Sequence, residues 1–270
     1  MGAPDTTDSL QRLRAACAEV GFDFDSVAPA VVARIRLLAE CTETVSDCER
    51  MIAIARDVFR YYDRVKPLAS FNQAERRIVV LGCVFSDIGK TGPASASTSG
   101  QRLVLEMFAV EGVPDDTQPV TQFLRTYFPR DADERIRRFA ELGLDPALTI
   151  REFWNLHSTW TLEIAEAGGV PPEVVAAAAT HHLLDDINPR AIVDTQNRFT
   201  CPSGDNPAFD RAEKLIILLD KYDAVRRRGR RQHPQAIAWL RSCVEKSHHF
   251  HGDAELLTLI ADLDEVAVAS

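Results

Sequence analysis

Residues 77–93 read Arg77-Ile-Val-Val-Leu-Gly-Cys-Val-Phe-Ser-Asp-Ile-Gly-Lys-Thr-Gly-Pro93 and join two kinds of sequence. The first part, as far as Phe85, is apolar on nearly every side of a helix, which is typical of a helix at the centre of a protein. Asn72 and Glu75 stand before it at the spacing of a capping box, so we expect the helix to begin there. Asp87 then lies at the end of a buried helix.

Helix signals recur along the rest of the chain. Ser46 with Glu49 and Thr149 with Glu152 form two more capping-box pairs, and Pro172 suits the first turn of a helix. Apolar residues also recur with helical spacing in residues 8–19, 27–39 and 209–227. Strand signals are few, and only residues 191–201 suggest a short extended piece. The sequence therefore predicts an all-α protein.

The helical segments indicate one main domain with additions. We expect residues 1–40 to form a helical segment that packs on the core, and residues 41–270 to form the main domain. The stretch 94–100 is rich in Ser, Ala, Thr and Gly and is typical of a loop. It opens a mostly helical segment, about 94–148, that we interpret as an insertion.

Composition limits the classes of function. The chain has 270 residues and a net charge of −9, which argues against a protein that coats a nucleic acid polymer. No apolar run is long enough for a membrane span and no signal peptide is evident, so we expect no membrane partner. The six cysteines include no CxxC pair, which favours reduced thiols in a cytoplasmic protein. The sequence leaves open whether the chain forms a homodimer or binds a signalling partner protein.

Five potential metal ligands lie at or near the predicted helix ends: Asp87, His157, His181, His182 and Asp220. Imidazole and carboxylate groups bind Zn, Fe, Mn and Ni ions, and a helical bundle can direct such side chains inward from several helices. Adjacent histidines on a helix point about 100° apart, so His181 and His182 need not bind the same ion. Taken singly, each residue is also explained as a core or capping group, with Gly89 as a left-handed C-cap after Asp87.

The order of these motifs resembles the HD superfamily of metal-dependent phosphohydrolases. Residues 86–93, Ser-Asp-Ile-Gly-Lys-Thr-Gly-Pro, resemble its HDIGK-x-G-x-P signature, especially that of the HD-GYP branch. His157, the pair His181-His182 and the stretch Asp220-Lys-Tyr-Asp-Ala224 resemble the motifs that follow in that family. The resemblance implies an HD-domain helical bundle. It also implies a phosphohydrolase or phosphodiesterase that acts on a nucleotide or cyclic dinucleotide, with cyclic di-GMP as the substrate of the HD-GYP branch.

The resemblance also implies roles for individual residues. Asp87, His157, His181 and His182 would bind one divalent transition metal ion (Fe, Mn, Zn or Ni). Asp87 and Lys90 would be catalytic, and the phosphate-containing substrate would contact four residues, Lys90, Asp223, Arg228 and Arg230. The arginine-rich stretch 226–231 is equally well explained as a solvated helix end. A second, oxygen-rich half of the metal site would comprise Glu43, Asp47 and Asp220.

The chain departs from the family at three places. Ser86 stands where the family has a histidine before the aspartate, and Asp47 aligns with an earlier family histidine. The residues after His182 lack the GYP loop. Since a serine hydroxyl is a poor transition-metal ligand, we expect one ion rather than two. The departures support an alternative, a degenerate and catalytically inactive HD domain that serves as a nucleotide-binding or protein-interaction signalling module.

Overall fold

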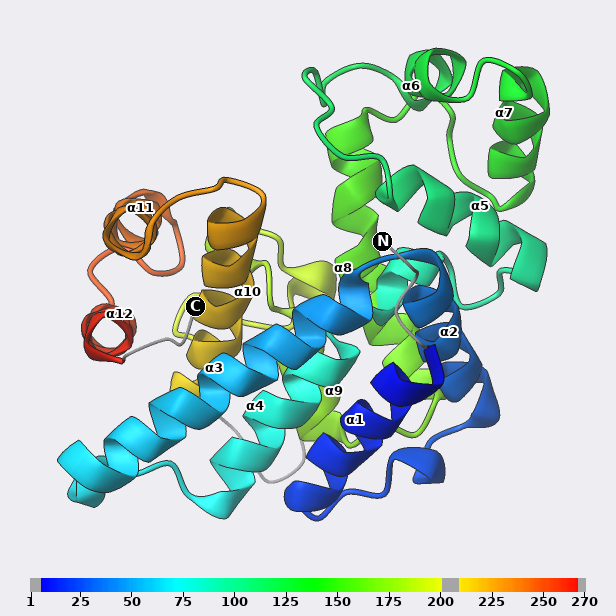
Figure 1. Ribbon diagram of the computed structural model, residues 1–270. Coiled ribbons are helices and arrows are strands. Elements are labelled where there is room, and N and C mark those ends of the chain that lie inside the picture. Colours follow the sequence, from blue (N-terminus) through cyan, green and yellow to red (C-terminus); the bar gives the residue numbers. More distant parts are fainter. Residues whose placement is uncertain (1–5, 201–208, 267–270) are drawn as a thin grey trace.

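The computed structural model describes residues 6–200 and 209–266, and helices are its regular elements (Figure 1). No strand forms in these ranges, where two isolated bridges join Pro119 to Thr149 and Val193 to Phe199. The all-α prediction is therefore confirmed. The twelve α-helices are α1 (Thr6–Glu19), α2 (Pro29–Cys41), α3 (Thr44–Val65), α4 (Gln73–Phe85), α5 (Thr98–Phe108), α6 (Val120–Tyr127), α7 (Ala132–Glu141), α8 (Ile150–Ala167), α9 (Pro172–Ala179), α10 (Arg211–Arg227), α11 (His233–Lys246) and α12 (Ala254–Glu265). The 3₁₀ helices are η1 (Phe24–Ser26), η2 (Pro67–Ala69), η3 (Ile88–Thr91), η4 (Leu183–Asp185) and η5 (Pro189–Ala191).

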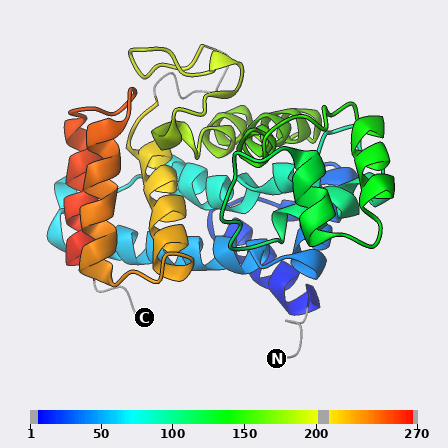
Figure 2. The ribbon, with the colours of Figure 1, turned by 90° about the horizontal axis from the view of Figure 1, so that it is seen from above.

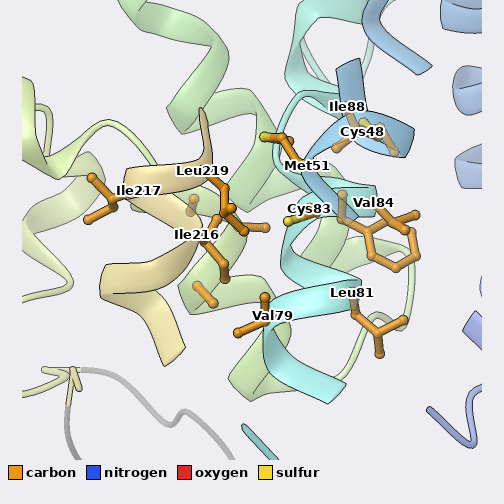
Figure 3. Close-up of a cluster of buried hydrophobic side chains, with 14 of the residues drawn as sticks. Cys48, Met51, Val79, Leu81, Cys83, Val84, Ile88, Ile216, Ile217 and Leu219 are labelled. Carbon is orange, nitrogen blue, oxygen red and sulfur yellow. The ribbon is translucent and has the colours of Figure 1, made fainter. Parts of the chain in front are cut away.

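Helix α4 is the central element of the fold. It packs against α3, α9 and α10, and every residue from Ile78 to Phe85 is buried. Figure 3 shows apolar side chains of α3, α4 and α10 meeting in this core, among them Met51, Val79 and Leu219. Because α4 is surrounded, the turn that follows it begins deep inside the protein.

The capping residues were mostly predicted correctly. The Asn72–Glu75 and Thr149–Glu152 capping boxes form at the starts of α4 and α8, and Pro172 lies in the first turn of α9. The Ser46–Glu49 prediction is wrong, because α3 begins two residues earlier, at Thr44. The Thr42 hydroxyl accepts a hydrogen bond from the Thr44 N–H at 3.2 Å, and Thr44 and Val45 are buried, so packing extends the helix toward its N-terminus.

Two groups of helices lie at opposite ends of the molecule. Figures 1 and 2 both place α11 and α12 at one end and α5, α6 and α7 at the other. The second group falls within residues 94–148, the segment predicted to be mostly helical, and α8 leads back from it to α9. In the N-terminal segment, helix α1 packs on α3 and α4, and helix α2 packs on α1, α3 and η3.

Two sequence predictions concern membranes and cysteines. None of the helices in the described ranges is both long and apolar enough to cross a membrane. Five cysteines in those ranges are unpaired, namely Cys17, Cys41, Cys48, Cys83 and Cys243. The sixth, Cys201, lies outside the described residues. Of the predicted extended piece at 191–201, the structure describes residues 191–200, which form a turn closed by the bridge between Val193 and Phe199.

Candidate metal centre

The site lies where η3, α8, the end of α9 and α10 meet. Asp87 occupies the turn between α4 and η3, and His157 lies on α8. Helix α9 ends at Ala179, so His181 and His182 lie in the turn after it rather than in its last turn. Gly89 permits a close approach of η3 to α8, because a Cβ atom there would lie 1.9 Å from the carbonyl oxygen of His157. Its φ is not positive, so Gly89 is not the left-handed C-cap considered above.

Three side chains form a small triangle of ligand atoms. His157 Nε2 lies 3.1 Å from His181 Nε2, and Asp87 Oδ1 lies 3.6 Å and 3.7 Å from these two nitrogens. The radius of the circle through three points is the product of the sides divided by four times the area. For these sides it is about 2.0 Å, which is the length of a zinc–nitrogen or zinc–oxygen bond. The three atoms therefore fit one divalent ion.

The protonation of the two histidines supports the same conclusion. His157 Nδ1 donates to the carbonyl oxygen of Trp154 at 2.5 Å, and His181 Nδ1 donates to that of Ala178 at 2.7 Å. Because Nδ1 of each ring is the donor in these bonds, Nε2 is the nitrogen left to face an ion, and the two Nε2 atoms lie 3.1 Å apart. Metal-binding histidines usually donate such a hydrogen bond from the ring nitrogen that does not face the ion.

A proton is a poor replacement for a cation between these rings. His157 and His181 are 4% and 0% exposed, and burial together with the nearby His181 lowers the pKa of His157 to about 3. A hydrogen bond between the two Nε2 atoms would require one ring to be a buried imidazolium. A divalent cation would instead satisfy both lone pairs and the Asp87 carboxylate.

Asp87 is ionised in this environment. Burial alone would raise its pKa, but interactions led by the ammonium of Lys90 outweigh burial and lower the pKa below its usual range. Lys90 Nζ donates to Asp87 Oδ2 at 2.7 Å, which leaves Oδ1 directed toward the histidines. The carboxylate is thus available as a ligand at neutral pH.

His182 has different partners from His181. The ligand atoms of His157, His181 and His182 all lie within 4.8 Å of one another. However, His182 Nδ1 accepts a hydrogen bond from Lys221 Nζ at 2.9 Å and lies 3.8 Å from Asp220 Oδ2. Burial, with the nearby lysine charges, lowers its pKa well below the usual value, so the ring is neutral. In this arrangement His182 lies beside the triangle, and its role as a ligand stays a prediction.

Two acidic residues of the predicted second half, Glu43 and Asp47, pair with arginines, as does the predicted substrate contact Asp223, whereas Asp220 lies beside His182 and Lys221. Asp47 pairs with Arg50, and its Oδ2 lies 2.6 Å from an Arg227 nitrogen. Asp223 accepts hydrogen bonds from Arg50 at 2.8 and 3.1 Å. Glu43 is the exposed N-cap of α3 and lies 3.6 Å from Arg227. Within the described ranges, the group of ligands that lies close enough for one ion is at the histidines and does not include Glu43, Asp47 or Asp223.

Ser86 is turned away from this centre. Its hydroxyl donates to the carbonyl oxygen of Cys83 at 3.3 Å, and the residue is 1% exposed. The hydroxyl therefore donates to one of the carbonyl oxygens in the last turn of α4.

A pocket of about 750 Å³ opens beside the histidines. Lys90, Lys221, Arg228 and Arg230 are among the cations that line it, and Phe108 and Trp154 are its aromatic members. Across the described part of the chain, no ion pair engages Arg228 or Arg230, whereas Arg227 pairs with four acidic residues. The predicted phosphate-binding arginines therefore border the pocket with free guanidinium groups.

Sequence reasoning overlooked several residues around the site. Arg50 and Lys221 were not assigned roles, because Asp223, which Arg50 contacts, and His182, which Lys221 contacts, lie far away in sequence. Arg34 contacts the loop after η3, and Thr161 contacts both sides of Asp87. Arg34 could have been noticed, because it lies on the same helical stripe as Val31 and Leu38 and is a charged residue among apolar ones.

Comparison of the chain with protein-family models, with curated proteins and with solved structures finds no match.

Proposed function

We propose that this chain is a metal-dependent phosphohydrolase or phosphodiesterase whose single divalent ion is bound by Asp87, His157 and His181. The observation that carries the proposal is the triangle of one carboxylate oxygen and two imidazole nitrogens, whose centre lies one bond length from each atom. The ordered resemblance to HD motifs in the sequence supports phosphate-ester chemistry at this centre.

Different groups of the protein would support the ion and bind the substrate. When bound, the ion would supply Lewis acidity that activates water and stabilises charge on the phosphoryl group. Lys90, whose ammonium holds Asp87, keeps the carboxylate ionised and adds positive charge at the wall of the pocket. Arg228 and Arg230 would bind phosphate oxygens, since a guanidinium donates two parallel hydrogen bonds to such a group.

The pocket favours a substrate with a flat aromatic part as well as a phosphate. Phe108 and Trp154 line the same space as Arg228 and Arg230. Aromatic side chains stack on nucleobases of any sequence. A nucleotide or cyclic dinucleotide would use both features, and cyclic di-GMP is one compound of this class to examine.

The test is hydrolysis of bis(p-nitrophenyl) phosphate by the full chain with added Mn²⁺ or Zn²⁺. We expect turnover that Asp87→Ala reduces at least about a hundred-fold, or about 2.7 kcal/mol in activation free energy. Asp264→Ala, on the exposed side of α12, serves as the control. Replacing both Arg228 and Arg230 by alanine should raise KM and leave metal affinity unchanged. Equal rates for Asp87→Ala and the wild type would contradict the proposal.

A second candidate function is binding of the same ligand without turnover. It is favoured by the arginines that hold Asp47 and Asp223, because these carboxylates are then engaged by protein cations. This function predicts no hydrolysis but a higher melting temperature when a nucleotide is added. The hydrolysis and melting measurements, made on one preparation, distinguish the two functions.

A further inference from the structure

Arg34 on α2 is a buried arginine that binds backbone. It is 4% exposed, and none of the carboxylates in the described ranges pairs with it. Its guanidinium instead donates to the Thr91 hydroxyl at 2.7 Å and to the carbonyl oxygens of residues 91–94 at 2.9–3.4 Å. Burying a charge is costly unless hydrogen bonds compensate it, and burial lowers the pKa of Arg34 to about 10. Such an arrangement fixes the chain just after η3.

Thr161 on α8 fixes the chain just before and inside η3. Its hydroxyl accepts a hydrogen bond from the Gly89 N–H at 3.1 Å and donates to the Ser86 carbonyl oxygen at 2.8 Å. One hydroxyl therefore bridges the residues on both sides of Asp87. Thr161 is fully buried and lies four residues after His157, on the same face of α8.

The hydrogen bonds within the turn do not fix its position relative to the helices around it. Hydrogen bonds from Lys90 N to Asp87 O and from Gly92 N to Gly89 O set the internal shape of the turn. Ile88 is buried, but apolar packing is not directional. A metal site tolerates ligand displacements of only about 0.2 Å, so the turn must be held relative to the histidines.

We infer that Arg34 and Thr161 are positioning residues that hold the turn 86–94 from two helices, so that Asp87 meets His157 and His181 at metal-binding distance. This inference rests on the proposed function. It gives the N-terminal helix α2 a part in the site, through Arg34.

The test measures Zn²⁺ affinity by competition with a chromophoric chelator, together with thermal melting of the metal-free proteins. Thr161→Val removes the hydroxyl at nearly constant shape, and Thr161→Ser retains it. We expect Thr161→Val to weaken Zn²⁺ binding about 10–100-fold and Thr161→Ser to remain within about three-fold of the wild type. Arg34→Lys keeps the charge but loses the planar fork, so a loss of about ten-fold is expected.

Asp262→Ala is the control for general destabilisation. It disrupts contacts between α12 and α3, so it should lower the melting temperature and leave Zn²⁺ affinity unchanged. Wild-type affinity in both Thr161→Val and Arg34→Lys would overturn the inference and leave the proposed function standing. A loss of affinity in Asp262→Ala equal to that in Thr161→Val would also overturn it. A wild type that binds no Zn²⁺ would overturn the proposed function and the inference together.

Discussion

Replacing Gly89 by alanine should disturb the candidate site, because it adds a methyl group between η3 and α8. The new Cβ would lie 1.9 Å from the His157 carbonyl oxygen, 2.6 Å from the Thr161 nitrogen and 2.8 Å from its hydroxyl. The first two atoms are backbone of α8 and cannot rotate away, so η3 and α8 must separate. Overpacking typically costs about 1–3 kcal/mol, and we expect a loss of about 3 kcal/mol or more because backbone must move.

The same separation should weaken metal binding. A shift large enough to relieve the clash exceeds the roughly 0.2 Å that a metal site tolerates, so Zn²⁺ affinity should fall at least about a hundred-fold. Urea denaturation of metal-free protein and Zn²⁺ competition measure the two effects separately.

Gly82→Ala provides the matched control for this prediction. Its Cβ would lie 2.3 Å from the end of the Ile216 side chain, which can rotate, and its other near neighbour is the Ala177 side chain rather than a ligand residue. This variant should lose stability but retain Zn²⁺ affinity. If Gly89→Ala unfolds at the wild-type urea concentration and binds Zn²⁺ as the wild type does, the described approach of η3 to α8 is incorrect.

Two further predictions concern stability. Asp262 is 4% exposed and accepts hydrogen bonds from Tyr62 at 2.5 Å and Lys66 at 2.6 Å. Asp262→Ala should therefore lower the unfolding free energy measured in urea by about 2–3 kcal/mol, and Asp264→Ala, at a more exposed position, by less than about 1 kcal/mol. Similar losses for the two variants would show that the contacts of Asp262 do not stabilise the fold. In metal-free protein, the pKa of His157 is about 3 in the folded state and 6.5 in the unfolded chain, so the unfolded chain binds the proton first as pH decreases. The unfolding free energy should therefore fall between pH 6.5 and pH 3, by up to about 1.4 kcal/mol per pH unit. His157→Gln should reduce that slope, and an unchanged slope between about pH 7 and about pH 5 would contradict the buried neutral histidine.

The sequence was most informative where local patterns and packing agree. The apolar run before Phe85 identified the central helix, and two of three capping boxes formed because the polar pair stood directly before an apolar stripe. The third failed at Ser46, since burial of Thr44 and Val45 determined where α3 begins.

The sequence predicted the ligand residues of the candidate site better than it predicted the charged residues around them. Asp87, His157 and His181 were identified from their order along the chain, and the structure brings them together. Arg50 bonds Asp223 across 173 residues, and no local pattern connects such partners. The pairs between these carboxylates and arginines could therefore be identified only in the folded structure.

The most direct test of the central claim is X-ray absorption of the full chain after it is loaded with Zn²⁺ and desalted. We expect about one ion per chain, bound by nitrogen and oxygen atoms at about 2.0 Å, and loss of the ion in His181→Ala. Protein that retains no ion after desalting would contradict the account, as would His181→Ala protein with the wild-type zinc content and spectrum.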